Sequence, residues 1–328
     1  MWTVGPAALT GWRPLRAQPA PRQRRIGYIG YTAANTADDE RVLAAFRQRL
    51  RELGLEDGRN LTIEWRFGEG RLEREQELAT ELLKLGVELV VVGSGTAARA
   101  VMAAGPGIPV VTIAVPDPVR AGLVQSLARP GGQVTGISNL ADDLTPKRLE
   151  LLKTAVPSAT RIAIARCPQC VLSAGESHDA LSALYETHAD AAKRLGVTLL
   201  ALDVNDRQDF DAAAATLKRE RPPALLINAT QINHALRSEW VALAQSLRLP
   251  SMASTRSFGA MLSYGPDFAA IFRRAAEFIA LILNGTKPAD LPMEQPTRFE
   301  FVVNLKFARA IGVDVSRQAL QRADEVIE

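Results

Sequence analysis

Residues 108–139, IPVVTIAVPDPVRAGLVQSLARPGGQVTGISN, form the stretch that decides how the chain is expected to fold. The apolar run Val110–Val115 is typical of a strand buried on both faces of a parallel sheet. A Pro-Asp-Pro sequence ends this run, because proline cannot donate to a strand ladder. A short helix is predicted over 119–127 and a further strand over 134–137. Asp117 therefore follows the carboxyl end of a buried strand, where ligands bind in open α/β sheets.

Strands and helices alternate on both sides of this stretch in two similar series. Before it, strand-like runs are separated by amphipathic helices that end at glycines. After it the series restarts, since RIAIAR at 161–166 resembles RIGYIG at 25–30 and Gly196 ends a helix as Gly54 does. The pattern predicts an α/β protein with two Rossmann-like, doubly wound lobes.

The last part of the chain does not fit two lobes that simply follow one another. A long amphipathic helix at 268–284 and a strand at 299–303 come after a finished second lobe, so the chain is expected to return to the first lobe and cross back. Three crossings would form a hinge with a cleft between the strand ends of the two lobes. The expected division is 25–140 plus about 262–287 for lobe 1 and 141–261 plus about 288–328 for lobe 2.

The composition is that of a globular protein, with 328 residues, 47% of them hydrophobic, and a formal net charge of +3. Basic side chains are interleaved with acidic ones and no basic stripe carries aromatic residues, so nucleic-acid binding is not expected. No apolar run approaches the ~20 residues of a membrane span. Residues 1–24 lack periodicity and fit either the remnant of an export signal or a disordered tail, and they are left out of the predicted fold.

Residues 93–98, GSGTAA, resemble a dinucleotide-binding fingerprint. That fingerprint belongs to the first βα turn of a domain, whereas this one follows the third predicted strand. The interpretation that we favour uses the same physics: N–H groups at a helix N-terminus, with Gly95 and the Ser94 and Thr96 hydroxyls, hold an anion such as an α-carboxylate. A plain tight turn stays open as an alternative.

Asp117 is the natural partner for an α-ammonium group in the cleft, but it could equally be the N-cap of the predicted helix that follows. Tyr264 either stacks on an aromatic or cationic ligand or packs in the hinge. The other polar candidates follow strands or lie at the first crossing, and they are Thr32, Asn139, Asn228, Thr230, Gln231 and Ser254.

Cys167 and Cys170 are the only cysteines, in a C-x-x-C sequence. No thioredoxin-like unit surrounds them and two cysteines are too few ligands for structural zinc, so a structural bridge or two free thiols is favoured over redox chemistry. The three histidines belong to no Ser-His-Asp set, and no G-x-S-x-G sequence occurs. Neither catalysis nor a metal or cofactor is expected.

Several stretches together resemble a known family. They are GRN at 58–60, IEWR at 63–66, IPVV at 108–111, DPV at 117–119, SLARPGG at 126–132, KRLELLK at 147–153, SYG at 263–265, PADLP at 288–292 and EQP at 294–296. Across about residues 25–328 the chain is similar to the substrate-binding proteins of bacterial ABC importers, in the subfamily of tryptophan- and tyrosine-type binding proteins. It departs from the family at 166–168, where Arg-Cys-Pro stands in place of a frequent Asn-Pro.

The resemblance implies the type I periplasmic-binding fold and a monomeric, extracytoplasmic protein. It implies that the protein captures a small solute, such as an aromatic or other amino acid, and delivers it to a membrane permease and its ATPase. Two alternatives stay open, which are a receptor that presents its closed lobes to a membrane sensor and an α/β enzyme that uses a nucleotide.

Overall fold

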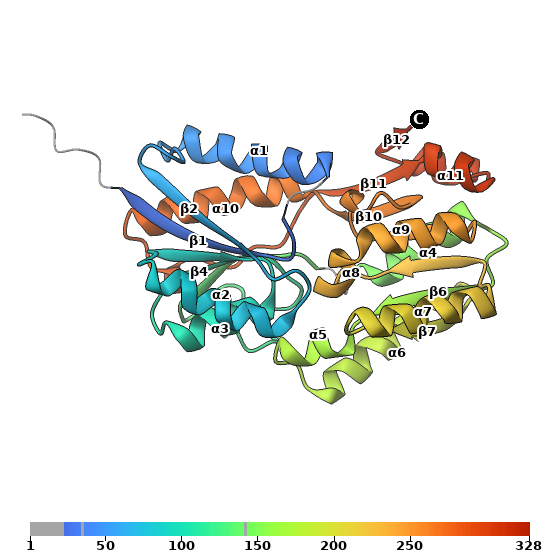
Figure 1. The fold of residues 1–328 in the computed structure, drawn as a ribbon, viewed down its shortest axis with the longest axis horizontal. Coiled ribbons are helices and arrows are strands. Elements are labelled where there is room, and N and C mark those ends of the chain that lie inside the picture. The colour runs from blue at the N-terminus through green and yellow to red at the C-terminus, as the bar shows by residue number, and fades with distance from the viewer. Residues whose placement is uncertain (1–22, 34–35, 141–142) are drawn as a thin grey trace, which may run out of the picture.

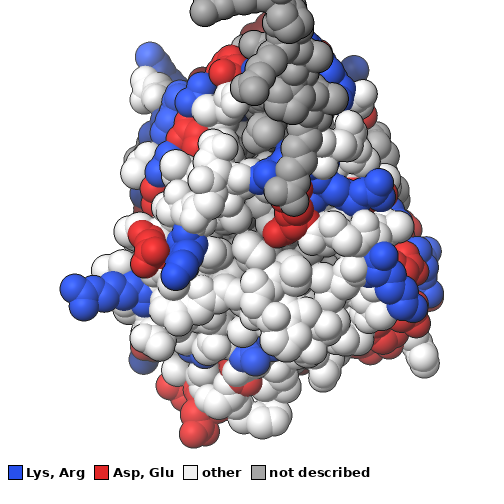
Figure 2. Space-filling view, turned by 90° about the vertical axis from the view of Figure 1, so that its left-hand side faces the viewer, with Lys and Arg blue, Asp and Glu red and all other residues white. Residues whose placement is uncertain are grey.

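Two α/β lobes lie end to end in the computed structural model, which describes residues 23–33, 36–140 and 143–328 (Figure 1). Most of the predicted leader or tail, up to residue 22, lies outside the described residues. Of the helices within those ranges, none combines the length and the apolar character needed to cross a membrane. Figure 2 views the outer end of the first lobe, where basic and acidic side chains are interspersed around a largely uncharged centre.

The first lobe is built on a five-stranded parallel sheet. In sheet order its strands are β2 (Leu61–Phe67), β1 (Arg24–Gly30), β3 (Leu89–Val92), β4 (Val110–Val115) and β5 (Val134–Ser138). Its helices are α1 (Ala37–Glu52) and α10 (Phe268–Leu283) on one face and α2 (Leu72–Lys84) and α3 (Gly95–Ala104) on the other (Figure 1). Every residue of β3 and β4 is buried, because helices cover both faces of these apolar strands.

The second lobe has a seven-stranded sheet, parallel except where β11 pairs antiparallel with β10. In sheet order its strands are β12 (Glu325–Ile327), β11 (Phe299–Asn304), β10 (Leu262–Pro266), β9 (Ser251–Ala253), β8 (Ala224–Ile227), β6 (Arg161–Arg166) and β7 (Thr198–Asp203). Its helices are α4 (Thr145–Ala155), α5 (Pro168–Ser173), α6 (His178–Arg194), α7 (Arg207–Glu220), α8 (Gln231–Ala235), α9 (Arg237–Ser246), α11 (Leu305–Ile311) and α12 (Arg317–Arg322), with a 3₁₀ turn η1 at Arg256–Phe258. The predicted architecture of two doubly wound α/β lobes is confirmed.

The sheets correct the expected assignment of the tail to lobes at two places. Strand β10 was expected in the first lobe but pairs with both β9 and β11 of the second sheet. Residues 288–296 were expected in the second lobe but run along β5, where the Ser138 N–H donates to the Glu294 carbonyl at 2.9 Å. The chain crosses at Asp267 instead, whose N–H donates to the Arg298 carbonyl at 3.0 Å and so joins the second crossing to the third.

The helix predicted over 119–127 is absent, and the structure has a series of turns there. Gly122 has a φ of 64°, a left-handed conformation that a continuing α-helix does not allow. The N–H of Leu123 donates to the Pro118 carbonyl at 2.9 Å, which closes a single turn. The strand predicted next is present as β5.

Candidate functional site

A cavity of about 130 Å³ lies between the lobes, many times the ~10–15 Å³ that one water molecule needs. It opens at the carboxyl ends of β1, β3 and β4 of the first lobe and of β8 and β9 of the second, where the topology of α/β sheets places ligands. Helices α1 and α10 close it from the side of the first lobe. The cavity therefore has walls from both lobes.

One end of the cavity is apolar and comes entirely from the first lobe. We call this the apolar end, and its residues are Tyr28, Val42, Leu43, Phe67, Ile113 and Phe272. The rings pack together, since the Tyr28 ring lies 6.2 Å from that of Phe67 and 6.3 Å from that of Phe272, centroid to centroid. Such a surface favours an apolar or aromatic part of a ligand.

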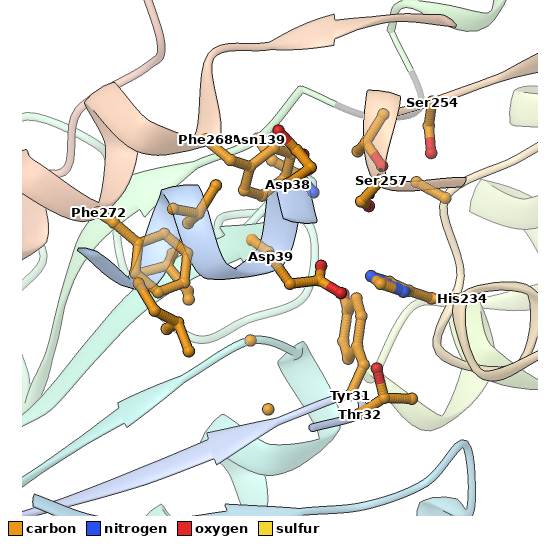
Figure 3. A pocket seen from close by; sticks show the side chains of 18 of the residues that line it. Tyr31, Thr32, Asp38, Asp39, Asn139, His234, Ser254, Ser257, Phe268 and Phe272 are labelled. Carbon is orange, nitrogen blue, oxygen red and sulfur yellow. Dashed lines mark hydrogen bonds between the residues drawn. The ribbon is translucent and has the colours of Figure 1, made fainter. Parts of the chain in front are cut away.

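The opposite end, which we call the polar end, is shared between the lobes. Its residues are Thr32, Asp38, Asp39 and Asn139 from the first lobe and Thr230, His234, Ser254 and Ser257 from the second. Figure 3 shows Phe272 on the far side of Asp39 from His234, Ser254 and Ser257. A ligand that filled the cavity would thus meet an apolar surface at one end and charges and hydroxyls at the other.

The first turn of α1 places the two carboxylates at the polar end. Thr36 caps the helix by accepting from the Asp39 N–H at 3.1 Å, and the Asp39 carboxylate accepts from the Thr36 N–H at 3.1 Å. This capping box fixes Asp39, and negative charge is favourable at a helix N-terminus.

Each of these aspartates pairs with an arginine of the second lobe. Arg237 is 3% exposed and donates through Nη2 to Asp39 at 2.9 Å and through Nη1 to the Thr32 hydroxyl at 2.9 Å. Arg256 lies 3.1 Å from the Asp38 carboxylate through its Nε. Because these contacts join α1 to α9 and η1, the structure is of the closed form.

His234 is a neutral imidazole in this setting. Burial, reinforced by the charge of Arg237, lowers its pKa to about 4. Its Nδ1 lies 3.3 Å from Nη1 of Arg237, which can only donate, so Nδ1 accepts and the proton is on Nε2. The ring thus offers the site a neutral N–H donor at physiological pH.

Ser254 brings an unpaired hydroxyl to the polar end. The residue is 1% exposed, and its Oγ has no hydrogen-bond partner within the described ranges. Figure 3 shows it projecting near Ser257 on the second-lobe side of the cavity. A buried hydroxyl without a partner costs ~1–3 kcal/mol, which a ligand that accepts from it would recover.

Four of the residues predicted from the sequence line the cavity, namely Thr32, Asn139, Thr230 and Ser254. The structure places the predicted anion-binding loop elsewhere. The Ser94 and Thr96 hydroxyls both donate to the carboxylate of Glu75, a buried residue of α2, with 2.9 Å from Ser94. The two hydroxyls that were predicted to hold a ligand anion are thereby already bonded to a carboxyl group of the chain itself.

The Thr96 hydroxyl is hydrogen-bonded both to Glu75 and to a residue of the second lobe. Gln231, a predicted site residue, donates through Nε2 to the Thr96 Oγ1 at 3.0 Å across the lobes. Burial raises the pKa of Glu75 to about 7, although the two hydroxyls that donate to it act in the opposite direction. Of the predicted loop, Gly93 lines the cavity, whereas Thr96 forms a contact between the lobes.

Asp117 also lies outside the cavity, 40% exposed at its side chain. Its Oδ1 accepts from the N–H groups of Val119 and Arg120 at 3.2 and 2.9 Å. Asp117 therefore caps the turn that follows it, because its carboxylate accepts from N–H groups of that turn.

Asn228 and Tyr264 serve the second lobe and the hinge. Asn228 accepts through Oδ1 from the Thr145 hydroxyl at 3.3 Å. The Tyr264 ring stacks on Phe299 at 6.1 Å, and its carbonyl accepts from Nε of the buried Arg148 at 2.8 Å. These contacts match the hinge-packing alternative for Tyr264.

Cys167 and Cys170 are joined in a disulfide at the start of α5. This segment borders the first lobe, where Arg99 Nε donates to the Ala174 carbonyl at 2.7 Å and Arg120 pairs with Glu176. The disulfide therefore links the two ends of the first turn of α5, close to a contact between the lobes. Among the described residues, no group of three or more His, Cys, Asp or Glu side chains could hold a metal ion.

Sequence reasoning missed the two aspartates, His234 and the aromatic residues of the cavity. The Asp-Asp-Glu sequence at 38–40 is typical of the acidic first turn of a helix, and it forms the first turn of α1. This helix is the element that follows β1, at the same edge of the sheet as the ligand cleft. This position in the topology was the signal available for Asp38 and Asp39.

Comparisons with known proteins identify the family. The family model for ABC transporter substrate-binding proteins matches residues 38–327. A tyrosine-binding protein from Clostridioides difficile is 24% identical over 295 residues, which cover 89% of this chain and 82% of the relative.

Solved structures share the fold. A domain from Streptococcus pneumonia in complex with L-Trp is 23% identical with a TM-score of 0.79, covering 93% of this chain and all of the other. A ligand-free, open substrate-binding protein from Clostridium difficile is 21% identical with a TM-score of 0.61, covering 93% of this chain and 99% of the other. With two lobes closed over a cavity and a family model that matches nearly the whole chain, this protein belongs to the family of ABC transporter substrate-binding proteins.

Proposed function

We propose that the cavity captures an aromatic amino acid for import. As a substrate-binding protein of an ABC transporter, the chain binds a small solute rather than converting it, outside the cytoplasm. Two relatives support the chemical class, because one is a tyrosine-binding protein and the other is seen in complex with L-Trp. The permease and ATPase of an importer are the expected partners, and the working unit would be a monomer.

The observation that carries this proposal is the division of the cavity into an apolar and a polar end. An aromatic side chain would lie among the rings of the first lobe, where offset and edge contacts between rings are favourable. Its α-ammonium group would lie near Asp39 and Asn139, and its α-carboxylate would accept from the Ser254 and Ser257 hydroxyls. An aromatic amine lacks the carboxylate that the two serine hydroxyls would bind. An aromatic carboxylic acid lacks the ammonium group that Asp39 would bind. Both are therefore expected to bind more weakly than the amino acid.

Capture would work through closure, since the two ends of the solute touch different lobes. Only a ligand with higher affinity for the closed form shifts the equilibrium between open and closed states. A shift from 1:99 to 99:1 requires about 5.5 kcal/mol of such preference. The permease would then recognise the closed arrangement of the lobes.

A thermal-shift screen of the full chain tests this proposal. It compares the amino acids with aromatic amines, aromatic carboxylic acids and nucleotides. Phenylalanine, tyrosine or tryptophan should raise Tm, because a ligand at one hundred times its Kd adds about 2.7 kcal/mol of stability. Stabilisation by nucleotides alone, or by an amine as strongly as by its amino acid, would contradict the proposal.

A matched pair of variants connects the screen to the site. Ser254→Ala should weaken binding of the amino acid about tenfold, since it removes a buried hydroxyl aimed at the carboxylate. Ser246→Ala removes an exposed hydroxyl of α9 and should leave the affinity unchanged.

A further inference from the structure

The apolar end of the cavity contains one polar side-chain atom, the hydroxyl of Tyr28. Tyr28 is in β1 and is 7% exposed. Its neighbours in the apolar end, such as Val42, Phe67 and Phe272, carry no donor or acceptor on their side chains. A phenylalanine would make the same ring contacts here, so packing alone does not explain the hydroxyl.

The ring of Tyr28 is fixed by its surroundings. It packs against Trp65 with 4.7 Å between centroids and against Phe67 and Phe272 at slightly greater distances. It lies over Gly30, where an added Cβ would come within 2.6 Å of Cε1 and 3.2 Å of the hydroxyl of Tyr28. The absence of a side chain at Gly30 therefore lets the ring extend along the strand toward the cavity.

Among the described residues, the ring of Tyr28 makes aromatic contacts but its hydroxyl forms no hydrogen bond. Burial raises the pKa of Tyr28 far above its ordinary value, so the group stays a phenol that can both donate and accept. Tyr28 lines the cavity, and its hydroxyl is not among the atoms that are fully enclosed without a partner. The hydroxyl is therefore free to form a hydrogen bond with a group that enters the cavity.

We propose that Tyr28 determines specificity at the apolar end by forming a hydrogen bond with a polar group on the ring of the solute. This inference rests on the proposed function and deepens it. The group is a phenol hydroxyl or an indole N–H, so the site selects tyrosine or tryptophan over phenylalanine. A ligand without such a group would leave the Tyr28 hydroxyl unpaired in the closed cavity, and sites built to hydrogen-bond a substrate group reject analogues that lack it.

Isothermal titration calorimetry of the full chain with tyrosine, tryptophan and phenylalanine tests the inference. The wild-type protein should bind tyrosine or tryptophan about tenfold more tightly than phenylalanine, which corresponds to about 1.4 kcal/mol. Tyr28→Phe should bring the affinities within about twofold of each other while phenylalanine binds at least as tightly as before. Tyr264→Phe, which removes a hydroxyl outside the cavity, should preserve the wild-type preference.

A second measurement needs no variant and covers the case in which Tyr28→Phe fails to fold. The wild-type protein is titrated with 4-methylphenylalanine and N1-methyltryptophan, which keep the size of the rings but lose the hydroxyl or the N–H donor. A tenfold loss for either, relative to its parent amino acid, supports the inference and identifies which group Tyr28 binds.

The outcomes separate the inference from the proposed function. Equal affinities of the wild-type protein for phenylalanine and for both other amino acids would overturn the role of Tyr28 and leave aromatic amino-acid capture standing. A Tyr28→Phe protein that loses affinity equally for all three would also overturn it, because Tyr28 would then only shape the cavity. Failure of all three to bind would overturn the proposed function itself, and the inference with it.

Discussion

Two loops of the first lobe begin a helix with the same kind of side-chain cap but have different surroundings. The loop after β3 enters α3 through Ser94, which accepts from the third N–H of the helix, and the loop after β1 enters α1 through Thr36 in the same way. Both loops leave the carboxyl end of a parallel strand. The hydroxyls of the first bind Glu75 of the neighbouring α2, whereas the second leads into the helix whose two aspartates lie at the polar end of the cavity.

The difference shows that a helix N-terminus specifies the kind of group that it binds but not where that group comes from. After β3 the Ser94 and Thr96 hydroxyls bind a carboxyl group, and the chain supplies it itself from Glu75. After β1 the capping box supplies a carboxylate, Asp39, that projects toward the second lobe. Both loops contact the second lobe, but only the one after β1 leads to carboxylates at the polar end of the cavity.

The largest effect is expected from Asp39→Asn, which leaves the buried guanidinium of Arg237 without that carboxylate. Asparagine still accepts from the Thr36 N–H, so the cap of α1 is kept. Loss of one partner of a buried charge pair costs ~2–5 kcal/mol, so Kd for the aromatic amino acid should rise by about 30-fold or more. Calorimetric titration measures it.

Glu40→Gln is the control for this variant, because Glu40 is an exposed carboxylate in the same turn of α1. It should change the affinity less than about twofold, as surface substitutions do. If Asp39→Asn bound the solute as tightly as Glu40→Gln, the loop after β1 would have no more part in binding than the loop after β3.

The next effect concerns Glu75 and depends on pH. Its pKa is about 7 in the folded protein against an ordinary value of 4.5, so between these values the folded state holds a proton that the unfolded state lacks. This contribution is fully present below about pH 4.5 and is lost as the pH rises through about 7. Relative to the wild type, Glu75→Gln should therefore gain about 3 kcal/mol in free energy of unfolding across this range.

Urea unfolding at a series of pH values between 4.5 and 8 measures the change. Glu77→Gln, which alters an exposed carboxyl of the same helix, should follow the wild type at every pH. Parallel curves for the wild type and Glu75→Gln would contradict the raised pKa of the Glu75 carboxyl.

The smallest effect is expected from Gln231→Met, which removes the hydrogen bond from the second lobe to Thr96 but keeps a side chain of similar length. One net hydrogen bond contributes ~1 kcal/mol, so solute binding should weaken about fivefold through loss of a closed-state contact. Gln245→Met, at an exposed position of α9, is the matched control. An unchanged affinity for Gln231→Met would show that the contact at Thr96 does not favour closure.

Much of the fold could be predicted because its signals are local. The apolar runs of β3 and β4, the amphipathic helices and the glycines that end them lie within short windows of sequence. The fold of two similar lobes followed from the repetition of these windows. The lobe to which β10 belongs could not be predicted, because strand pairing with β9 and β11 depends on residues up to about forty positions away.

The residues of the candidate site also separate into those that local sequence predicts and those that depend on tertiary contacts. The sequence by itself determined that Thr32, Asn139, Thr230 and Ser254 follow strands at the ligand-binding edge, and the structure brings these four to one cavity. Only the tertiary structure decided that Glu75 fills the loop after β3 and that Asp39 meets Arg237. The physical reason is that a strand or helix arises from neighbours in sequence, whereas the partner of a buried charge or hydroxyl is whichever group the packed lobes bring within hydrogen-bond distance.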